Sequence, residues 1–273
     1  MKKGFAQIIS SGQYASIQDK GRFGFENYGV PPSGYLIRNE IISQAINAIE
    51  FIGTGLTLRF SDPVTLRFYG KGIGVKKNEE VFRDVFAISV KGGEILTIIE
   101  NVGVSGYLFT ELGWITERVM GSFSQSKGVT FYDRLLKGVT LSYFSDNSDV
   151  LILNKEKEGP TSDKDIIIKA LPGPEFIKYG CMLTELQLTI SPDTNRQAVC
   201  FKENAEGIFN EIKSSYTPVG TIQITKAGKV FILSRDGQTT GGYFRWGFIS
   251  EKDLGLLCSF SPGTEVVVSM RSI

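Results

Sequence analysis

The residues best suited to chemistry lie in a glycine-rich stretch, SRDGQTTGGYFRWG, at positions 234–247. Gln238, Thr239 and Thr240 offer an amide and two hydroxyls, which suit a small polar or carboxylate-bearing molecule. Neighbouring glycines let backbone N–H groups approach a ligand closely. A hairpin needs only about two to five turn residues, so the stretch is longer than a plain turn requires. Two interpretations are therefore open, a ligand-binding loop and a structural loop.

A second stretch of this kind, SIQDKGRFGFENYGVPPSG at positions 16–34, follows neither a helical nor a strand period. Its carboxylate, Asp19, and its guanidinium, Arg22, can pair with each other or with a ligand. Ser33 can cap a following helix, with the adjacent prolines fixing the approach of the chain. Here too a structural role and a binding role are both open.

Two shorter motifs follow predicted strands. LPGPE (171–175) places two prolines around a glycine, which is typical of a rigid strand-to-helix turn. SPDTNR (191–196) offers Asn195 and Arg196 in a loop. This loop is either a surface turn or a site where Arg196 binds a carboxylate.

Several kinds of chemistry are absent from this chain. It has no histidine, which excludes Ser-His-Asp and Cys-His catalysis and most zinc sites for this chain alone. It also lacks the GxxxxGK[ST] and GxGxxG phosphate-binding motifs, so we expect it to bind no cofactor by itself. A net charge of +1, from 30 basic and 29 acidic residues, argues against a nucleic-acid partner.

The composition is typical of a globular protein, with 41% hydrophobic and 22% charged residues in 273. No apolar run reaches the roughly 20 residues of a membrane helix, and the start shows no signal-peptide pattern. We therefore expect a cytoplasmic protein without membrane contact. Cys181, Cys200 and Cys258 are widely spaced, which predicts structural thiols in a reducing compartment.

The elements that must position these motifs are mainly strands. Apolar β-forming segments between glycine and aspartate breaks predict strands at 56–60, 64–69, 94–100, 105–111, 165–171, 186–191, 220–225, 229–234 and 264–270. Helices are predicted at 38–51, 174–183 and 204–215. The charged stretch NKEKEGPTSDKD (154–165) is the best linker candidate, and it divides the chain into predicted domains 1–160 and 161–273. Many short strands with few helices favour barrel-like or sandwich domains.

Five motifs in this order give the chain a family resemblance: SIQDKGRFGFENYGVPPSG, LPGPE, SPDTNR, TPVGTIQI and DGQTTGGY. Through them it resembles the biotin-dependent carboxyltransferase / allophanate hydrolase subunit 2 family, which includes the C subunit of 5-oxoprolinase and a KipA-like antagonist of a sporulation kinase inhibitor. The resemblance implies a mainly β fold with two cyclophilin-like β-barrel domains. It also implies a KipI-like partner of the B type (allophanate hydrolase subunit 1) and, in 5-oxoprolinase, a lactam-utilisation-type partner of the A type.

The function implied by the resemblance is that of the C subunit of a 5-oxoprolinase-like complex, which opens 5-oxoproline or a related small amide to glutamate using ATP. The ATP would be handled mainly by partner chains. Two alternatives are a non-catalytic regulatory protein that sequesters a KipI-like partner, and a carboxyltransferase or allophanate hydrolase-type module of a urea-processing biotin enzyme. The second alternative needs a biotinylated partner, because this chain has no AMKM-type biotin acceptor.

Site residues follow from the matched motifs. Asp19, Arg22 and Asp236 are the predicted catalytic residues, with no metal site. The predicted substrate-binding residues are Gln18, Ser33, Asn195, Arg196, Gln223, Gln238, Thr239, Thr240, Gly241, Gly242 and Tyr243. Arg22 and Arg196 would hold a carboxylate, and the 238–240 side chains would contact the amide. The 16–34 and 236–243 stretches are then expected to converge on one site.

Two departures from the family pattern put activity in doubt. Ile37 stands where the family usually has an aspartate, and Ser215 where it has a glutamate. If those carboxylates act as acids or bases, each replacement removes about two to four powers of ten in rate. This loss favours the regulatory alternative.

Overall fold

A computed structural model describes residues 2–37, 42, 44–146, 153–154 and 166–271 of the chain. Its contacts divide the chain into two compact units. Unit 1 comprises Met1–Arg22 and Ser33–Pro160, and unit 2 comprises Phe23–Pro32 and Thr161–Ile273. The segment Phe23–Pro32 thus groups with unit 2, although the residues on either side of it belong to unit 1.

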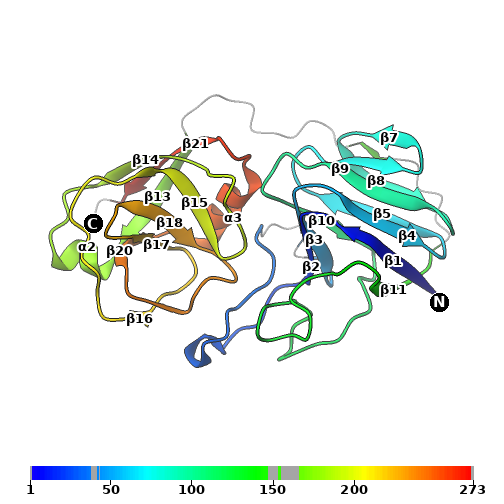
Figure 1. The fold of residues 1–273 in the computed structure, drawn as a ribbon, viewed down its shortest axis with the longest axis horizontal. Coiled ribbons are helices and arrows are strands. Elements are labelled where there is room, and N and C mark those ends of the chain that lie inside the picture. The colour runs from blue at the N-terminus through cyan, green and yellow to red at the C-terminus, as the bar shows by residue number, and fades with distance from the viewer. Residues whose placement is uncertain (1, 38–41, 43, 147–152, 155–165, 272–273) are drawn as a thin grey trace. The chain divides into compact units, whose positions relative to one another are not determined.

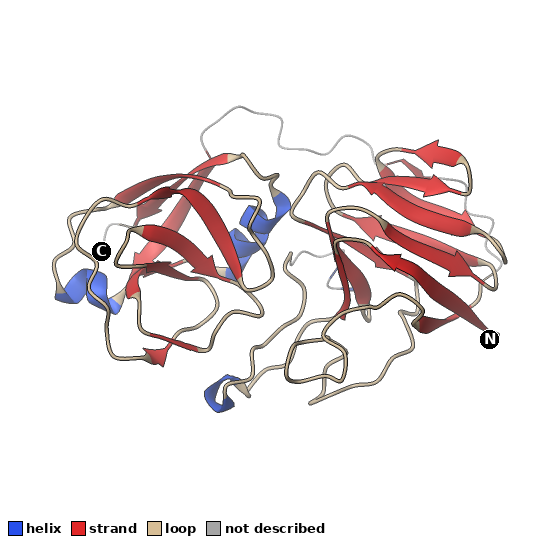
Figure 2. Ribbon diagram, viewed as in Figure 1, coloured by secondary structure: helices blue, strands red, loops and turns tan. Residues whose placement is uncertain are grey.

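Unit 1 contains two six-stranded sheets, in which neighbouring strands run antiparallel (Figures 1 and 2). The first sheet has the order β11-β1-β4-β9-β6-β7. Its strands are β11 (Thr140–Phe144), β1 (Lys3–Ser11), β4 (Leu56–Phe60), β9 (Ile95–Glu100), β6 (Gly74–Lys77) and β7 (Glu80–Phe82). The second sheet has the order β12-β8-β5-β10-β3-β2. Its strands are β12 (Leu153–Asn154), β8 (Val85–Val90), β5 (Val64–Tyr69), β10 (Ser105–Phe109), β3 (Ala48–Ile52) and β2 (Tyr14–Gln18).

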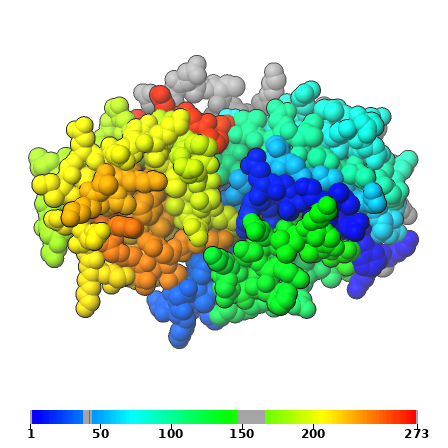
Figure 3. Space-filling view, in the orientation of Figure 1, coloured from blue at the N-terminus to red at the C-terminus, as the bar shows by residue number. Residues whose placement is uncertain are grey.

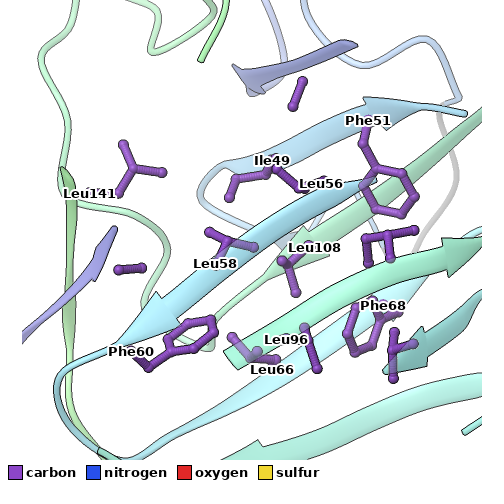
Figure 4. Packing of buried hydrophobic residues seen from close by; sticks show 14 of the residues in the cluster. Ile49, Phe51, Leu56, Leu58, Phe60, Leu66, Phe68, Leu96, Leu108 and Leu141 are labelled. Atoms are coloured by element: carbon purple, nitrogen blue, oxygen red, sulfur yellow. The ribbon is translucent and has the colours of Figure 1, made fainter. Parts of the chain in front are cut away.

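The core of unit 1 is one cluster of buried apolar side chains that both sheets supply (Figure 4). Leu58 and Phe60 come from one sheet, and Leu66, Phe68 and Leu108 from the other. Alternate residues of a strand point to the same face of the sheet, so each strand can bury every second side chain. Figure 3 shows one face of the molecule in space-filling form, coloured from the N-terminus to the C-terminus.

Unit 2 is built on a seven-stranded sheet with the order β14-β21-β13-β20-β17-β18-β15. Its strands are β14 (Glu185–Thr189), β21 (Glu265–Met270), β13 (Ile166–Pro172), β20 (Phe244–Phe248), β17 (Thr221–Ile224), β18 (Lys229–Leu233) and β15 (Ala198–Asn204). An isolated bridge between Ile190 and Phe201 joins the chain just after β14 to β15, so the sheet nearly closes into a barrel. The other elements are α2 (Pro174–Lys178), α3 (Glu251–Ser259), the 3-10 helix η1 (Glu26–Tyr28) and a two-stranded ladder of β16 (Ser215–Tyr216) with β19 (Thr240–Gly241).

The prediction of a mainly β fold is confirmed, and each of the nine predicted strands has a counterpart (Figure 2). The helix prediction over 38–51 is wrong from residue 45 onward, because residues 45–47 are not helical and residues 48–51 belong to β3. Residues 38–41 and 43, like residues 155–165 of the proposed linker, lie outside the described part of the chain. The helix prediction for 174–183 is too long, because α2 ends at Lys178.

The helix predicted over 204–215 is also wrong. Asn204 ends β15, residues 205–214 form a loop, and Ser215 begins β16. The Ala205 N–H donates to the Gly228 carbonyl (2.8 Å), and the Ile212 N–H donates to the Gly242 carbonyl (2.8 Å). Because the Ile212 N–H binds a partner distant in the chain, it cannot also form a helical hydrogen bond to residue 208.

The LPGPE motif is the strand-to-helix turn that its composition predicts. It joins β13 to α2, with Pro174 at the first helical position. Glu175 in this turn accepts two hydrogen bonds from Arg245 of β20, both of 2.6 Å. Both side chains are largely buried, with exposed fractions of 9% for Glu175 and 15% for Arg245. This bidentate pair ties the start of α2 to the sheet.

Replacing Glu175 with glutamine is expected to lower the free energy of unfolding by about 1.5–3 kcal/mol at neutral pH, the usual contribution of a hydrogen bond to a charged group. Burial alone would raise the pKa of Glu175, but the hydrogen bonds and charge of Arg245 outweigh burial and hold this pKa below its usual 4.5. The pair therefore stabilises the fold above pH 4.5, and this contribution is lost as the pH falls below 4.5 through the lower pKa of the folded state.

Urea unfolding of the wild type and of Glu175→Gln between neutral and acidic pH measures this effect. The difference between the two proteins should shrink on acidification. Glu185→Gln, which changes an exposed carboxylate on β14, is the matched control and should change stability by less than about 0.5 kcal/mol. A wild-type advantage over Glu175→Gln that stays constant across this pH range would contradict the linkage.

Cys181 and Cys200 are partly buried free thiols, and Cys258 is buried. None of the helices in the described residues is long and apolar enough to cross a bilayer.

Candidate functional site

Asp19 is the centre of a buried hydrogen-bond network in unit 1. Its carboxylate accepts from the Gly21 N–H (2.8 Å), the Ser122 hydroxyl (2.6 Å), the Phe123 N–H (2.7 Å) and the Ser124 hydroxyl (2.7 Å). Only 8% of the residue is exposed. Asp19 therefore joins the first motif to the 122–124 loop, about a hundred residues later in the chain.

Arg22, Gln18 and Ser33 continue this network. The Arg22 guanidinium donates to the Ser33 hydroxyl (3.1 Å) and to the Ser124 carbonyl, and only 2% of the residue is exposed. The Gln18 side chain is fully buried, and its oxygen accepts from the Gly34 N–H (3.2 Å). In this structure Ser33 accepts a hydrogen bond from Arg22, and these three side chains help fold the first motif on itself.

Close backbone approach explains the glycine at the end of the motif. A Cβ at position 34 would lie 2.8 Å from both the Cα and the nitrogen of Gly21, and the φ of Gly34 is +86°. Only glycine combines this conformation with such close contact. The end of the first motif is therefore held against Gly21 within the same motif.

The segment after Gly34 is fixed by a buried polar cluster. The Leu36 N–H donates to Glu50 (3.0 Å), the Ile37 N–H donates to the Tyr107 hydroxyl (2.8 Å), and this hydroxyl donates to Glu50 (2.7 Å). Burial, and then the charge of Glu50, raise the pKa of Tyr107 well above its usual range. Ile37 is 5% exposed, so this aliphatic residue packs into the interior.

In unit 2, an ion pair joins two of the predicted motifs. Arg196 of SPDTNR binds Asp236 of DGQTTGGY through Nε to Oδ2 (2.7 Å) and Nη2 to Oδ1 (3.3 Å). The exposed fractions of the two side chains are 5% and 15%. The Asp236 N–H also donates to the Arg196 carbonyl (2.8 Å). This pairing brings together two loops that the sequence separates by 40 residues.

Neighbouring segments hold the rest of the 236–243 loop. The Thr217 hydroxyl donates to the Gln238 carbonyl (3.1 Å), and the Thr217 N–H donates to the Thr239 carbonyl (2.9 Å). Gln238 and Thr240 remain exposed, and Thr239 is half-buried. The backbone of the loop is thus fixed while its polar side chains stay accessible, which is what a binding loop requires.

A pocket of about 170 Å³ in unit 2 lies beside this loop. Gln238, Thr239 and Tyr216 line it, together with Arg235 and Glu251. Arg235 is 1% exposed and its Nη1 lies 3.0 Å from Glu251 Oε1. Residues Phe23, Glu26 and Pro32 of the first motif, which group with unit 2, complete one wall. A buried guanidinium beside amide and hydroxyl groups suits a small polar ligand.

Sequence reasoning missed Arg235 and Glu251 as lining residues. Arg235 belongs to the SRDGQTTGGYFRWG stretch, so its position next to the predicted loop was an available signal. Glu251 begins α3, and the sequence shows no local pattern that would associate it with this loop.

The predicted residues separate into two groups. Gln18, Asp19, Arg22 and Ser33 lie in unit 1, and the predicted residues from Asn195 to Tyr243 lie in unit 2. The convergence of the two motifs on one site and the catalytic roles of Asp19, Arg22 and Asp236 stay predictions. Asn195 is exposed and uses its amide in its own turn, donating to the Asp193 carbonyl (3.0 Å) and accepting from the Gln197 N–H (2.7 Å). Within the described residues, no group of three or more His, Cys, Asp or Glu could hold a metal ion.

Comparison with known families places this combination of fold and motifs. The family described as carboxyltransferase domain, subdomain A and B, matches residues 28–269. The chain therefore belongs to the carboxyltransferase domain family, which agrees with the resemblance carried by the five motifs.

Two curated relatives are both named as the C subunit of 5-oxoprolinase. The relative from Escherichia coli (strain K12) is 26% identical over 288 residues, which cover 95% of this chain and 89% of the relative. The relative from Haemophilus influenzae is 25% identical over 280 residues, with the same coverage.

Solved structures share the fold at lower identity. TTHA0988 matches 100% of this chain with a TM-score of 0.78 and 22% identity, and this chain covers 57% of it. Kluyveromyces lactis urea carboxylase matches 98% of this chain with a TM-score of 0.73 and 21% identity, and this chain covers 27% of it. The chain thus corresponds to part of these longer proteins, in one case about half.

Proposed function

We propose that this chain is the C-type subunit of a 5-oxoprolinase-like complex. The observation that carries the proposal is the name shared by the two curated relatives, each of which aligns over 95% of the chain. In this proposal, the chain supplies part of the binding site for a small amide-containing acid. Partners of the B and A types supply the remainder, and the complex uses ATP to open the substrate.

The geometry of unit 2 supports this role. The pocket beside the 236–243 loop combines the buried Arg235 with the hydroxyl of Thr239. A guanidinium can hold the carboxylate of an acid, and neutral polar groups can hold its amide. The Arg196–Asp236 pair fixes the loop that carries these groups, so we assign the pair a positioning role.

A non-catalytic regulatory role is a second candidate, and the surroundings of the predicted catalytic groups favour it. Asp19 accepts four hydrogen bonds from protein groups, and Asp236 binds Arg196. Ile37 is an interior aliphatic residue. A chain of this kind could bind a KipI-like partner without performing chemistry of its own.

Reconstitution of the complex tests the proposed function. The chain is co-expressed with its B-type and A-type partners, and ATP-dependent release of glutamate from 5-oxoproline is measured with and without it. We expect turnover only when the chain is present. Full turnover without the chain would refute the proposal, and partner binding without any turnover would support the regulatory candidate.

A single-residue variant of the reconstituted complex refines this test. Thr240→Val removes an exposed hydroxyl from the loop while keeping its β-branched shape, and kcat/KM should fall about five- to tenfold, as expected for the loss of one hydrogen bond. Thr184→Val, at an exposed threonine before β14, is the matched control and should leave kcat/KM unchanged. Equal kcat/KM values for the two variants would remove Thr240 from the site.

A further inference from the structure

Within the described part of unit 2, only the oxygen of the Gln223 side-chain amide forms a hydrogen bond. Gln223 lies in β17 and is fully buried. Its oxygen accepts a hydrogen bond from Gln238 Nε2 (3.1 Å). Its nitrogen is also buried, yet among the described residues it has no hydrogen-bond partner. Buried polar groups are nearly always paired, so an amide nitrogen left in this state calls for an explanation.

Gly241 makes room for this arrangement. A Cβ at position 241 would lie 2.6 Å from Gln238 Nε2 and 2.9 Å from Gln223 Nε2. Both contacts are too short for a real side chain, so any other residue would push the amides away. The glycine therefore keeps the two glutamine side chains together beside the loop.

A second unsatisfied group lies on the same side of the β16–β19 ladder. Ser215 pairs directly with Gly241, and directly opposed residues of an antiparallel pair project to the same face. The face toward which a Gly241 side chain would point is the one that carries the two amide nitrogens. The Ser215 hydroxyl is buried and, within the described part of the chain, has no hydrogen-bond partner. Two donors that lack acceptors among the described residues, Gln223 Nε2 and the Ser215 hydroxyl, thus project toward this face.

The donor and acceptor of the Gln223 amide indicate which ligand groups could bind to it. A glutamine amide presents an acceptor and a donor side by side, and Gln238 engages only the acceptor. A group that carries an N–H and a C=O on the same edge, such as a primary amide, a urea or a lactam, would engage both. A carboxylate lacks the donor, and an N-methylated lactam has lost it.

We propose that Gln223 is the residue that recognises the cis-amide edge of the substrate, and that Gln238 occupies its place when no ligand is bound. The inference rests on the proposed function for the identity of the amide-bearing substrate. Gln238 is exposed and lines the 170 Å³ pocket, so a ligand entering the pocket meets Gln238 first and exchanges with it. On exchange, the ligand N–H donates to Gln223 Oε1 and the ligand carbonyl accepts from Gln223 Nε2.

Binding of small lactams to the full chain tests this inference. The probes are 2-pyrrolidinone, its N-methyl derivative and propionate, and the readouts are ligand-observed NMR titration and the side-chain amide signals of ¹⁵N-labelled protein. We expect 2-pyrrolidinone to bind at least tenfold more tightly than either other probe. It should also shift the NMR signal of the Gln223 side-chain amide. That signal is assigned because it is missing from the spectrum of a Gln223→Glu protein.

Variants separate recognition from folding. Gln223→Glu removes the donor and should weaken 2-pyrrolidinone at least tenfold, whereas Gln187→Glu, at an exposed glutamine of β14, should leave binding unchanged. Gln238→Ala removes the competing amide and should strengthen binding at least twofold. If Gln223→Glu does not fold, the probe comparison in the wild type and the Gln238→Ala result still decide.

Several outcomes would overturn the inference. They are equal binding of the N-methylated lactam, unchanged binding by a folded Gln223→Glu protein, weaker binding by Gln238→Ala, or no binding of 2-pyrrolidinone by the wild type up to its solubility limit. The proposed function is tested separately by reconstituted turnover. A Gln223→Glu complex with full chain-dependent turnover would overturn this inference and leave the proposed function standing. Lactam binding that depends on Gln223, in a reconstituted complex without turnover, would support this inference and overturn the proposed function.

Discussion

Replacing Asp19 with alanine is expected to lower the free energy of unfolding of unit 1 by about 3–5 kcal/mol, the usual effect of removing one partner from a buried charged network. The substitution leaves the Ser122 and Ser124 hydroxyls and the Phe123 N–H without their acceptor, in surroundings where water cannot replace it. It also removes the side-chain hydrogen bonds between Asp19 and the 122–124 loop, while the hydrogen bond from Arg22 to the Ser124 carbonyl remains.

Urea unfolding, with hydrogen exchange of β2 and β3 amides to report on unit 1, measures the Asp19→Ala effect. Asp133→Ala is the matched control, because Asp133 is exposed and accepts from the Tyr14 hydroxyl through its main-chain oxygen, which the substitution keeps. It should change stability by less than about 0.5 kcal/mol. A similar small effect for Asp19→Ala would mean that the network does not stabilise the fold, and a catalytic role for Asp19 would gain support.

Replacing Gly173 with alanine is expected to lower the free energy of unfolding of unit 2 by about 3 kcal/mol, at the upper end of the cost of overpacking. A Cβ at position 173 would lie 2.1 Å from the Arg245 carbonyl oxygen and 2.8 Å from its carbon. The backbone cannot simply withdraw, because the Gly173 N–H donates to the Trp246 carbonyl (3.0 Å) and Pro172 pairs with Gly247. The clash must therefore displace α2 or β20.

Gly180→Ala separates this steric effect from conformational strain. Gly180 follows α2 with a φ of +60°, but a Cβ there would meet nothing within 4 Å. Its replacement should cost only about 1–2 kcal/mol, the penalty of a left-handed conformation. Chemical denaturation followed by tryptophan fluorescence compares the two variants. Equal losses for Gly173→Ala and Gly180→Ala would show that backbone conformation, and not close packing, explains the glycine in LPGPE.

Local sequence pattern was enough to predict most of the strands. The segment 56–60, for example, places apolar side chains at every second position, and the burial of β4 follows that period. The helix prediction over 38–51 failed because it extended an apolar period into β3, where Ala48, Ile49, Glu50 and Phe51 are all buried. A strand between two neighbours, buried on both faces, shows no alternation that would reveal it.

Residue types in the motifs also indicated which side chains could form charged hydrogen bonds, but not which partners they would bind. Composition pointed to Asp19, Arg22, Arg196 and Asp236 as groups able to form charged hydrogen bonds. It did not show that Asp236 is the partner of Arg196 or that Asp19 binds the 122–124 loop. The half-used amide of Gln223 was equally invisible, since the same residue in an exposed strand would be bound by water.

By itself, the sequence determined the mainly β fold, the strand positions and the candidate binding loops, because hydrophobic period and turn chemistry act over a few neighbouring residues. Tertiary structure alone decided the hydrogen-bond partners. Asp19 and Ser124 are 105 residues apart, and Glu175 and Arg245 are 70 apart. Such pairs form only when folding excludes water from both groups at one place, and no local pattern in the chain records where that happens.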